Sequence, residues 1–223
     1  RDYVPGIAGH LIACSVMSAP ASLVMAKLML PETGAPLTLG TTPLTPQSTT
    51  TSVLDAITTG TLDGMRLAAN VGAMLISFLA LTALVDFCLG WAGMHVLHVE
   101  LSLGRVFSWL FSPLAWLLGV SARDVPKVAS LLGQKTVLNE FVAYSSMAQH
   151  LRADPTWLSE RSRLIASYAL CGFANFGSIG IQIGGYGALA PERRADLARI
   201  APRAMVAGLL ATCLVACVAG VLV

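Results

Sequence analysis

The chain has 223 residues, of which 55% are apolar and only 12% are charged, and its mean hydropathy is +0.71. An ordinary soluble domain carries about a quarter charged residues because its surface faces water, so this composition indicates an integral membrane protein. The formal net charge is only +2 and no basic run is interleaved with aromatic residues, which argues against a nucleic-acid partner.

Two membrane helices are predicted in the first hundred residues. Residues 4–26 carry no formal charge, and their two prolines are tolerated in a membrane helix where neighbouring groups satisfy the freed carbonyls. Residues 67–95 begin with an uncharged stretch close to the roughly 20 apolar residues that cross the hydrocarbon. Between them, 27–66 is predicted to be a cytoplasmic loop, rich in Thr, Ser and Pro over 33–52, followed by a helix lying on the membrane surface.

The middle of the chain predicts shorter elements. Residues 99–130 are expected to form interfacial helices, because 106–121 is apolar, contains two tryptophans and is interrupted by Pro113. Residues 131–155 are predicted to form a re-entrant hairpin, which enters the membrane and turns back. In that segment an apolar sequence is interrupted by Lys135, Asn139 and Glu140.

A broken membrane helix is predicted for 164–190. The stretch carries no formal charge but contains six glycines between 172 and 187. Irregular backbone at membrane depth survives only where protein buries it or where it lines a watery cavity, so this segment is expected beside a substrate path. Residues 204–223 are the last predicted span. Together these elements predict an all-α integral membrane protein in which spanning helices accompany a re-entrant hairpin and a broken glycine-rich helix.

The positive-inside rule predicts the orientation. Four arginines lie within 192–203, immediately before the last span, and place that loop in the cytoplasm. A second basic group, made of Arg152, Arg161 and Arg163, lies one element earlier and is expected on the opposite side of the membrane.

Neither the cysteines nor the histidines form a pattern for a metal or redox site. The five cysteines include no CxxC pair, and Cys213 and Cys217 are interpreted as small packing residues on one helix face. His95 and His98 are interpreted as interfacial polar residues rather than zinc ligands. No GxSxG, HExxH or P-loop motif occurs, so the sequence predicts neither an enzyme nor a bound cofactor or metal.

Glu140 is the ionisable residue that most needs an explanation, because a charge at the bilayer centre costs about 2.5 kcal/mol or more. One interpretation is that its carboxylate reaches the headgroups or pairs with Lys135. The other is that it faces an aqueous cavity, where a carboxylate can accept two hydrogen bonds at once from the vicinal hydroxyls of a sugar.

Asn175 and Ser178 are three residues apart and share a face if their segment is helical. They could bind a polar ligand, since an amide and a hydroxyl both donate and accept, or they could hydrogen-bond a neighbouring helix. Spacing alone does not separate these interpretations. An aromatic residue such as Phe173 is more often part of a core than a platform for a ligand.

The segment GQKTVLNEFVAY (133–144) resembles the hairpin signature of the concentrative nucleoside transporter family, and SYALCGFANFGSIGIQIGG (167–185) resembles the broken helix that follows it there. Three further segments fit the same family in the same order: SVMSAPASLVMAKLMLPET (15–33), NVGAMLISFLALTALVD (70–86) and LAPERRADLARIAPRAMVAG (189–208). The resemblance covers nearly the whole chain, and the combination of NEFVAY with CGFAN is highly specific.

The resemblance implies cation-coupled import of nucleosides, driven by Na⁺ or H⁺, by a homotrimer in a bacterial cytoplasmic membrane. In the family pattern the Glu of NEF and the Asn and Ser of CGFANFGS bind the ribose, which implies this role for Glu140, Asn175 and Ser178. The aromatic residue of CGFAN, Phe173 here, is implied to lie beside the ligand.

The same resemblance implies that part of the site lies outside this chain. The family's first hairpin contacts the base and the helix beside it helps to hold the cation, and neither motif occurs in this sequence. Transporter folds of this kind are built from inverted repeats with the site between them. The chain is therefore expected to be the second, C-terminal half, as a fragment or a split gene product. Its start at Arg1 without a signal peptide suggests the same.

Two other classes of function stay open from the sequence. A truncated form that assembles with full-length partners through 67–95 would co-purify with them without transporting anything. A membrane enzyme that uses Glu140 as a general base would alter its nucleoside chemically.

Overall fold

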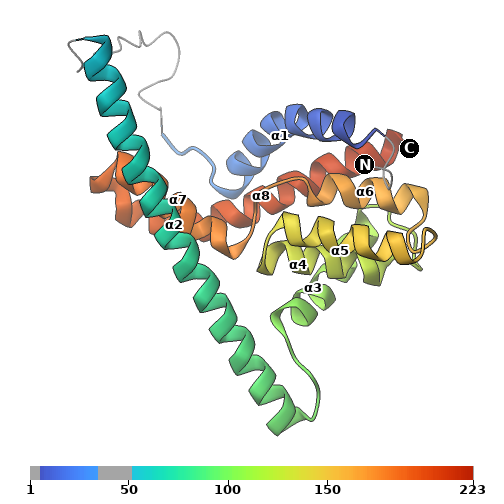
Figure 1. Cartoon of the computed structure of the whole chain (residues 1–223). Helices are drawn as coiled ribbons and strands as arrows, with labels where there is room; N and C mark the ends of the chain where they lie inside the picture. The colour runs from blue at the N-terminus through green and yellow to red at the C-terminus, as the bar shows by residue number, and fades with distance from the viewer. Residues whose placement is uncertain (1–5, 35–51, 223) are drawn as a thin grey trace.

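Eight α-helices carry the chain through residues 6–34 and 52–222, which are the residues that the computed structural model describes. They are α1 (Ile7–Met29), α2 (Val53–Ala92), α3 (Leu103–Leu117), α4 (Val125–Val137), α5 (Glu140–Ala153), α6 (Glu160–Leu170), α7 (Phe176–Leu189) and α8 (Arg194–Leu222). A π-helical turn at Gly93–Leu97 follows α2, and a 3-10 turn at Pro191–Arg193 precedes α8. In Figure 1, α4 and α5 lie side by side as a hairpin, whereas α2 crosses α7 and extends beyond the other helices at both ends. The predicted Thr/Ser/Pro-rich loop lies largely outside the described residues.

Five helices begin at a polar side chain that accepts a hydrogen bond from a backbone N–H three residues further on. Such a cap satisfies one of the N–H groups that a helix start leaves unpaired, and each is worth about 1 kcal/mol. The capping residues are Ser52 (α2), Ser102 (α3), Asn139 (α5), Ser159 (α6) and Asn175 (α7). Two of these caps therefore lie at the two segments in which the sequence predicts site residues.

Among the described residues, three helical segments are long and apolar enough to cross a membrane, namely Ile7–Met29, Val53–Val96 and Pro191–Leu222. In the most apolar stretch of each, only 11%, 6% and 44% of the residues are buried inside the chain, so most of this apolar surface is left for lipid or another protein. The predicted all-α membrane fold is confirmed. The last segment begins earlier than the expected 204–223, because charged residues at a helix start change its surroundings without interrupting its hydrogen bonds.

The expected surface helix and the second span form one helix. α2 runs unbroken from Val53 to Ala92, whereas the sequence predicted a helix on the membrane surface and then a span at 67–95. No proline lies in α2, so no residue removes a hydrogen bond from its ladder. Asp63 and Arg66, beside the expected boundary, form an ion pair of 3.7 Å within the helix. The charges there therefore do not mark the end of a helix.

The hairpin lies in the best-packed part of the chain. Its arms are α4 and α5, its turn is at 138–139, and fully buried leucines such as Leu131, Leu132 and Leu151 fill the space between them and α6. The first arm begins at Val125 rather than at the predicted 131. Pro126 can occupy the first turn of a helix because the N–H that it lacks would have no partner there. α3 packs along the outside of α4.

The predicted break in the glycine-rich helix lies at 171–175, between α6 and α7. The glycines of α7 serve a different purpose, which is close packing against α2. A Cβ added at Gly180 would lie 2.4 Å from Cδ2 of Phe78 and 3.0 Å from the backbone oxygen of Met74. A Cβ at Gly184 would lie 2.9 Å from Cγ of Met74. The glycines therefore allow the two helices to approach more closely than any side chain would permit.

Replacing Gly180 by Ala should destabilise the protein by about 1 to 3 kcal/mol, because the added methyl group overlaps α2. Gly185→Ala is the matched control, since its Cβ would lie at an ordinary 3.7 Å from Leu67. Thermal unfolding of the purified protein in detergent should show a lower midpoint for the first variant and an unchanged or higher midpoint for the second. Equal midpoints would contradict the close packing of α7 on α2.

Candidate functional site

Glu140 is the first residue of α5 and follows the hairpin turn directly. The side chain of Asn139 caps this helix by accepting a hydrogen bond of 2.9 Å from the backbone N–H of Val142. A carboxylate in the first turn also interacts favourably with the positive end of the helix dipole. Atom Oε2 of Glu140 is buried and has no hydrogen-bond partner in the described part of the chain. The start of α5 therefore holds the Glu140 carboxylate in place, but no described residue donates a hydrogen bond to its Oε2.

Asn175 begins the second half of the broken helix. Its Oδ1 accepts a hydrogen bond of 2.8 Å from the backbone N–H of Ser178, and the Ser178 hydroxyl accepts one of 3.2 Å from the N–H of Asn175. These two reciprocal bonds form a capping box. Since Oδ1 is occupied by a donor, the amide orientation is fixed and Nδ2 is left over. Asn175 is 1% exposed, and this buried Nδ2 has no partner among the described residues.

The two unpartnered atoms are complementary to a hydroxyl group. Most buried polar atoms in proteins are hydrogen-bonded, so each exception requires an explanation. Glu140 offers an acceptor and Asn175 offers a donor, and a sugar hydroxyl both donates and accepts.

The other two predicted residues lie in the same part of the fold. The Ser178 hydroxyl donates to the backbone oxygen of Asn175 at 2.6 Å, so with its capping bond it retains the capacity to accept one more hydrogen bond. Phe173 lies in the break between α6 and α7 and is 50% exposed. This exposed surface is available for contact with a ligand or another protein segment.

Both arms of the hairpin are tied to α6. Tyr144 on α5 donates a hydrogen bond of 2.5 Å to the backbone oxygen of Ser167, and Lys135 on α4 donates one of 2.8 Å to that of Ala169. Glu140 and Lys135 do not form an ion pair within the described residues, which contradicts the interpretation that they pair. The sequence indicated a charge at Lys135, but its partners are distant in the chain and no local pattern identifies them.

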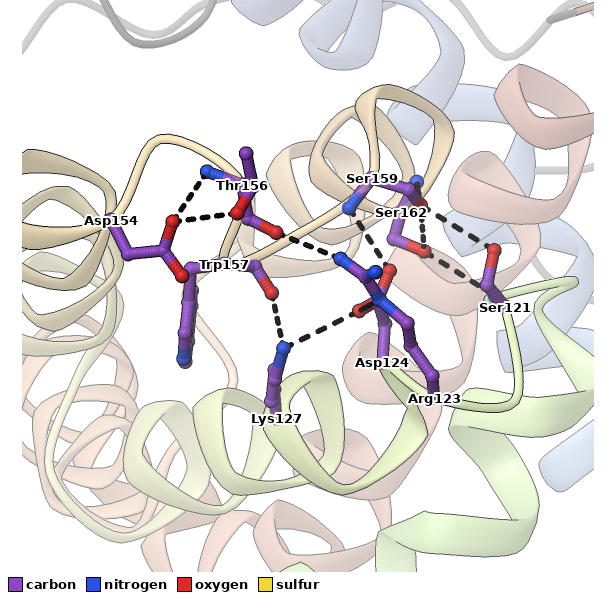
Figure 2. Close-up of polar contacts among 9 residues, drawn as sticks. All are labelled: Ser121, Arg123, Asp124, Lys127, Asp154, Thr156, Trp157, Ser159 and Ser162. Carbon is purple, nitrogen blue, oxygen red and sulfur yellow. Dashed lines mark hydrogen bonds and ion pairs between the residues drawn. The ribbon is translucent and has the colours of Figure 1, made fainter.

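The open end of the hairpin is closed by a second polar cluster, drawn in Figure 2. Asp124 precedes α4 and is 0% exposed, and its Oδ2 accepts a hydrogen bond of 3.0 Å from the backbone N–H of Ser159, which precedes α6. Its Oδ1 lies 3.3 Å from Nε of Arg123 and 3.6 Å from Nζ of Lys127. Lys127 also donates to the backbone oxygen of Trp157. These contacts hold the start of α4 against the connection between α5 and α6.

Asp124 lies outside the three candidate spans, and its surroundings keep it ionised. Burial alone would raise the pKa of Asp124, but hydrogen bonds from Ser159, Ser162 and Arg123 outweigh burial and lower the pKa from 3.8 to about 2. A carboxyl group whose pKa is lowered by folding stabilises the folded state above its unfolded pKa. This contribution is lost as the pH falls from about 4 towards about 2.

Asp124→Asn should remove about 2 kcal/mol of stability near neutral pH, as the change in pKa implies. The wild-type protein should also lose stability more steeply than the variant between pH 5 and pH 3, because only the wild type has this carboxylate to protonate. Denaturant unfolding in detergent at several pH values measures both effects. Parallel stability curves for the two proteins would show that Asp124 contributes no charge-dependent stability.

A cavity of about 660 Å³ lies between the second half of α1 and residues 200–208 of α8. It is lined mostly by apolar side chains, with Lys27, Glu32 and Arg203 at its rim, and it includes none of the four predicted site residues. Lys27 and Glu32 form an exposed ion pair of 2.7 Å. We therefore do not assign the sugar to this cavity.

His95 makes contacts within its own segment. Its Nδ1 lies 2.9 Å from the backbone oxygen of Trp91, and the two rings are stacked with centroids 4.8 Å apart. His98 has a φ of 52° and ends the π-helical turn. Both histidines therefore lie in the turn that ends the long α2 segment.

Comparison with known proteins supports the assignment of the fold. The family described as Na⁺ dependent nucleoside transporter C-terminus matches residues 10–220. Solute carrier family 28 member 3 of Mus musculus is 44% identical over 225 residues, and the match covers 96% of this chain and 32% of that protein. The uncharacterized transporter YutK of Bacillus subtilis (strain 168) is 43% identical over 216 residues, covering 96% of this chain and 52% of that protein.

A solved structure has the same arrangement of helices. A variant of CNTnw in an outward-facing state matches with a TM-score of 0.85 and 42% identity, covering 96% of this chain and 50% of that chain. The chain thus spans between about a third and a half of the length of these three relatives. It belongs to the family of Na⁺-dependent, or concentrative, nucleoside transporters, which are not enzymes, and corresponds to their C-terminal half.

Proposed function

We propose that this chain supplies the ribose-binding half of the substrate site in a cation-coupled nucleoside importer. The observation that carries the proposal is the pair of buried, unpartnered atoms, Oε2 of Glu140 and Nδ2 of Asn175. A buried polar atom without a partner costs about 1 to 3 kcal/mol, so both groups favour a ligand that satisfies them. Ribose presents two vicinal hydroxyls, each of which can donate to the carboxylate or accept from the amide.

The remaining two residues have supporting roles in this proposal. Ser178 holds Asn175 in its capping box and offers one acceptor to the sugar. Phe173, which is half-exposed, lies beside the nucleoside. The other half of the transporter contacts the base and supplies part of the cation site, since inverted-repeat carriers place their site between the two repeats.

We further propose that sodium is the coupling cation, in agreement with the description of the matching family. The transporter works by alternating access as a homotrimer in a bacterial cytoplasmic membrane. Residues 192–203 lie on the cytoplasmic side, because four arginines gather there. The large apolar surface of α2 offers area for contact between protomers, as only 6% of its most apolar stretch is buried inside the chain.

The second candidate is a non-transporting assembly partner. The same exposed surface of α2 and the partial coverage of the relatives favour it, since a chain with one half of a site could still associate with complete protomers. Co-purification with a complete transporter, combined with lack of uptake, would identify this role.

Uptake by the chain alone and with a first half distinguishes the two candidates. Proteoliposomes that contain residues 1–223 alone should show no uridine uptake above background, because the lost polar contacts, at about 1 kcal/mol or more each, leave binding in the millimolar range or weaker. Adding the first half should produce uptake that follows an imposed Na⁺ gradient and resists a protonophore. Na⁺-driven uptake by the lone chain would refute the requirement for a first half, and no uptake with both halves would refute the importer.

A further inference from the structure

The last turn of α4 carries a lysine that solvent does not reach. Lys135 is 0% exposed and is the largest fully buried side chain of the described residues. Burying an ammonium group is costly unless hydrogen bonds and charges compensate for the lost water. Lys135 belongs to the segment that ends in the hairpin turn, five residues before Glu140. Its partners therefore decide how this end of the hairpin is held.

Two distant helices supply these partners. Nζ of Lys135 donates a hydrogen bond of 2.8 Å to the backbone oxygen of Ala169 on α6 and one of 3.0 Å to Oγ1 of Thr212 on α8. The Thr212 hydroxyl donates its own proton to the backbone oxygen of Leu209 at 2.8 Å, so it is free to accept from Lys135. One ammonium group thus joins three helices.

The contact with Ala169 compensates for the end of α6. This helix ends at Leu170, and its last carbonyls lack the donors that a continuing helix would provide. The ammonium group supplies a donor to one of them, and a positive charge at a helix C-terminus also interacts favourably with the helix dipole. Lys135 therefore stabilises α6 at the point where the backbone leaves the helix.

The irregular segment 171–175 passes directly beside this contact. A Cβ added at Gly172 would lie 2.2 Å from Cγ2 of Thr212 and 3.8 Å from Nζ of Lys135, so only glycine fits there. The segment ends at Asn175, whose amide belongs to the proposed ribose site. On the hairpin side, Lys135 lies in the last turn of α4, and Glu140 follows it across the two-residue turn at 138–139. Both ribose-binding groups thus lie on segments that Lys135 fixes.

We propose that Lys135 is a positioning residue of the ribose site, joining the hairpin to α6 and α8 so that Glu140 and Asn175 keep a fixed relative geometry. The inference rests on the proposed function, because it requires these two groups to bind the sugar. Lys135 itself does not contact the sugar. Its loss raises KM for uridine and reduces the preference for nucleosides that carry both ribose hydroxyls.

The test compares uptake of uridine and 2′,3′-dideoxyuridine by complete transporters that contain this chain. We define the hydroxyl ratio as KM for the dideoxy compound divided by KM for uridine. Lys135→Met and Thr212→Val should each raise KM for uridine by about fivefold or more and reduce the hydroxyl ratio by a similar factor, as expected for a site whose polar groups are displaced. Thr212→Ser keeps the hydroxyl that accepts from Lys135 and should restore both values.

Thr136→Val is the matched control for burial on the same helix. Thr136 is 1% exposed, but its hydroxyl bonds only to the backbone oxygen of Leu132 within α4. A purely structural role for Lys135 would lower the amount of protein in the membrane, and hence Vmax, without changing KM or the hydroxyl ratio. If Lys135→Met does not reach the membrane, the comparison of Thr212→Val with Thr212→Ser decides whether the bond from Lys135 to Thr212 positions the site. Wild-type KM and hydroxyl ratio in Thr212→Val would overturn the proposal.

Glu140→Gln in the same assay separates failure of this inference from failure of the proposed function. A hydroxyl ratio that survives Glu140→Gln would refute the ribose assignment and, with it, the role of Lys135. A ratio that is lost in Glu140→Gln but kept in Lys135→Met and Thr212→Val would refute the positioning role alone.

Discussion

Replacing Glu140 by Gln should lower nucleoside uptake about tenfold or more in a complete transporter that contains this chain. The carboxylate has a buried oxygen without a partner, and hydrogen bonds to a charged group are worth about 1.5 to 3 kcal/mol. Gln keeps the shape of the side chain but replaces one oxygen by a donor and removes the charge. Since about 1.4 kcal/mol corresponds to a factor of ten, even the lower end of this range gives the stated loss. Initial rates of labelled uridine uptake, normalised to surface protein, measure it.

Glu160→Gln is the matched control. Glu160 is likewise the first residue of a helix and follows a capping residue, Ser159, but it is exposed and belongs to neither ribose-binding segment. We expect uptake to be unchanged in this variant. Wild-type uptake by Glu140→Gln itself would refute the ribose assignment.

Asn175→Asp should also lower uptake about tenfold or more, because it removes the Nδ2 donor while keeping the oxygen that caps α7. Aspartate caps a helix about as well as asparagine, so the bond from the N–H of Ser178 is kept. The substitution removes only the Nδ2 donor and places a second negative charge in the site. Because a carboxylate buried at this position also has a desolvation cost, uptake is normalised to folded surface protein and should fall further than the amount of that protein.

Asn175→Ala provides the contrast, because it removes the cap as well as the donor. It should lower the thermal midpoint, at a cost of about 1 kcal/mol for the lost cap, in addition to abolishing uptake. If Asn175→Asp transports normally, Nδ2 is not a ligand donor and the role of Asn175 is confined to starting α7.

The long helices of this fold are well predicted by composition and by long stretches without charged residues. The apolar stretches in 4–26 and 204–223 identify spanning helices because they are too long and too free of charge for a water-facing surface. The continuity of α2 was not predictable in the same way. The charged residues of 53–66 suggested separate surroundings, but only a backbone break such as proline would have ended the helix, and none is present. A change in the pattern of apolar and charged residues therefore does not by itself mark the end of a helix.

The sequence indicates candidate site residues where a single residue conflicts with its surroundings. Glu140 and Asn175 stand out because polar groups in apolar segments are expensive, and a polar atom of each has no partner in the described part of the chain. The contacts of Lys135 could not be predicted, since its two partners lie 34 and 77 residues away in the chain. The buried cluster around Asp124 likewise joins residues 35 positions apart, from Asp124 to Ser159. Such contacts depend on the tertiary fold and leave no local signal.

The most direct test of the account is the affinity of the complete transporter for nucleosides with and without ribose hydroxyls. Isothermal titration in the presence of Na⁺ should show that the wild type binds uridine about tenfold or more tightly than 2′,3′-dideoxyuridine, since at least one charge-assisted hydrogen bond is lost. Glu140→Gln should weaken uridine binding and reduce this preference to about threefold or less. An undiminished preference in Glu140→Gln would contradict the claim that this half of the transporter holds the ribose.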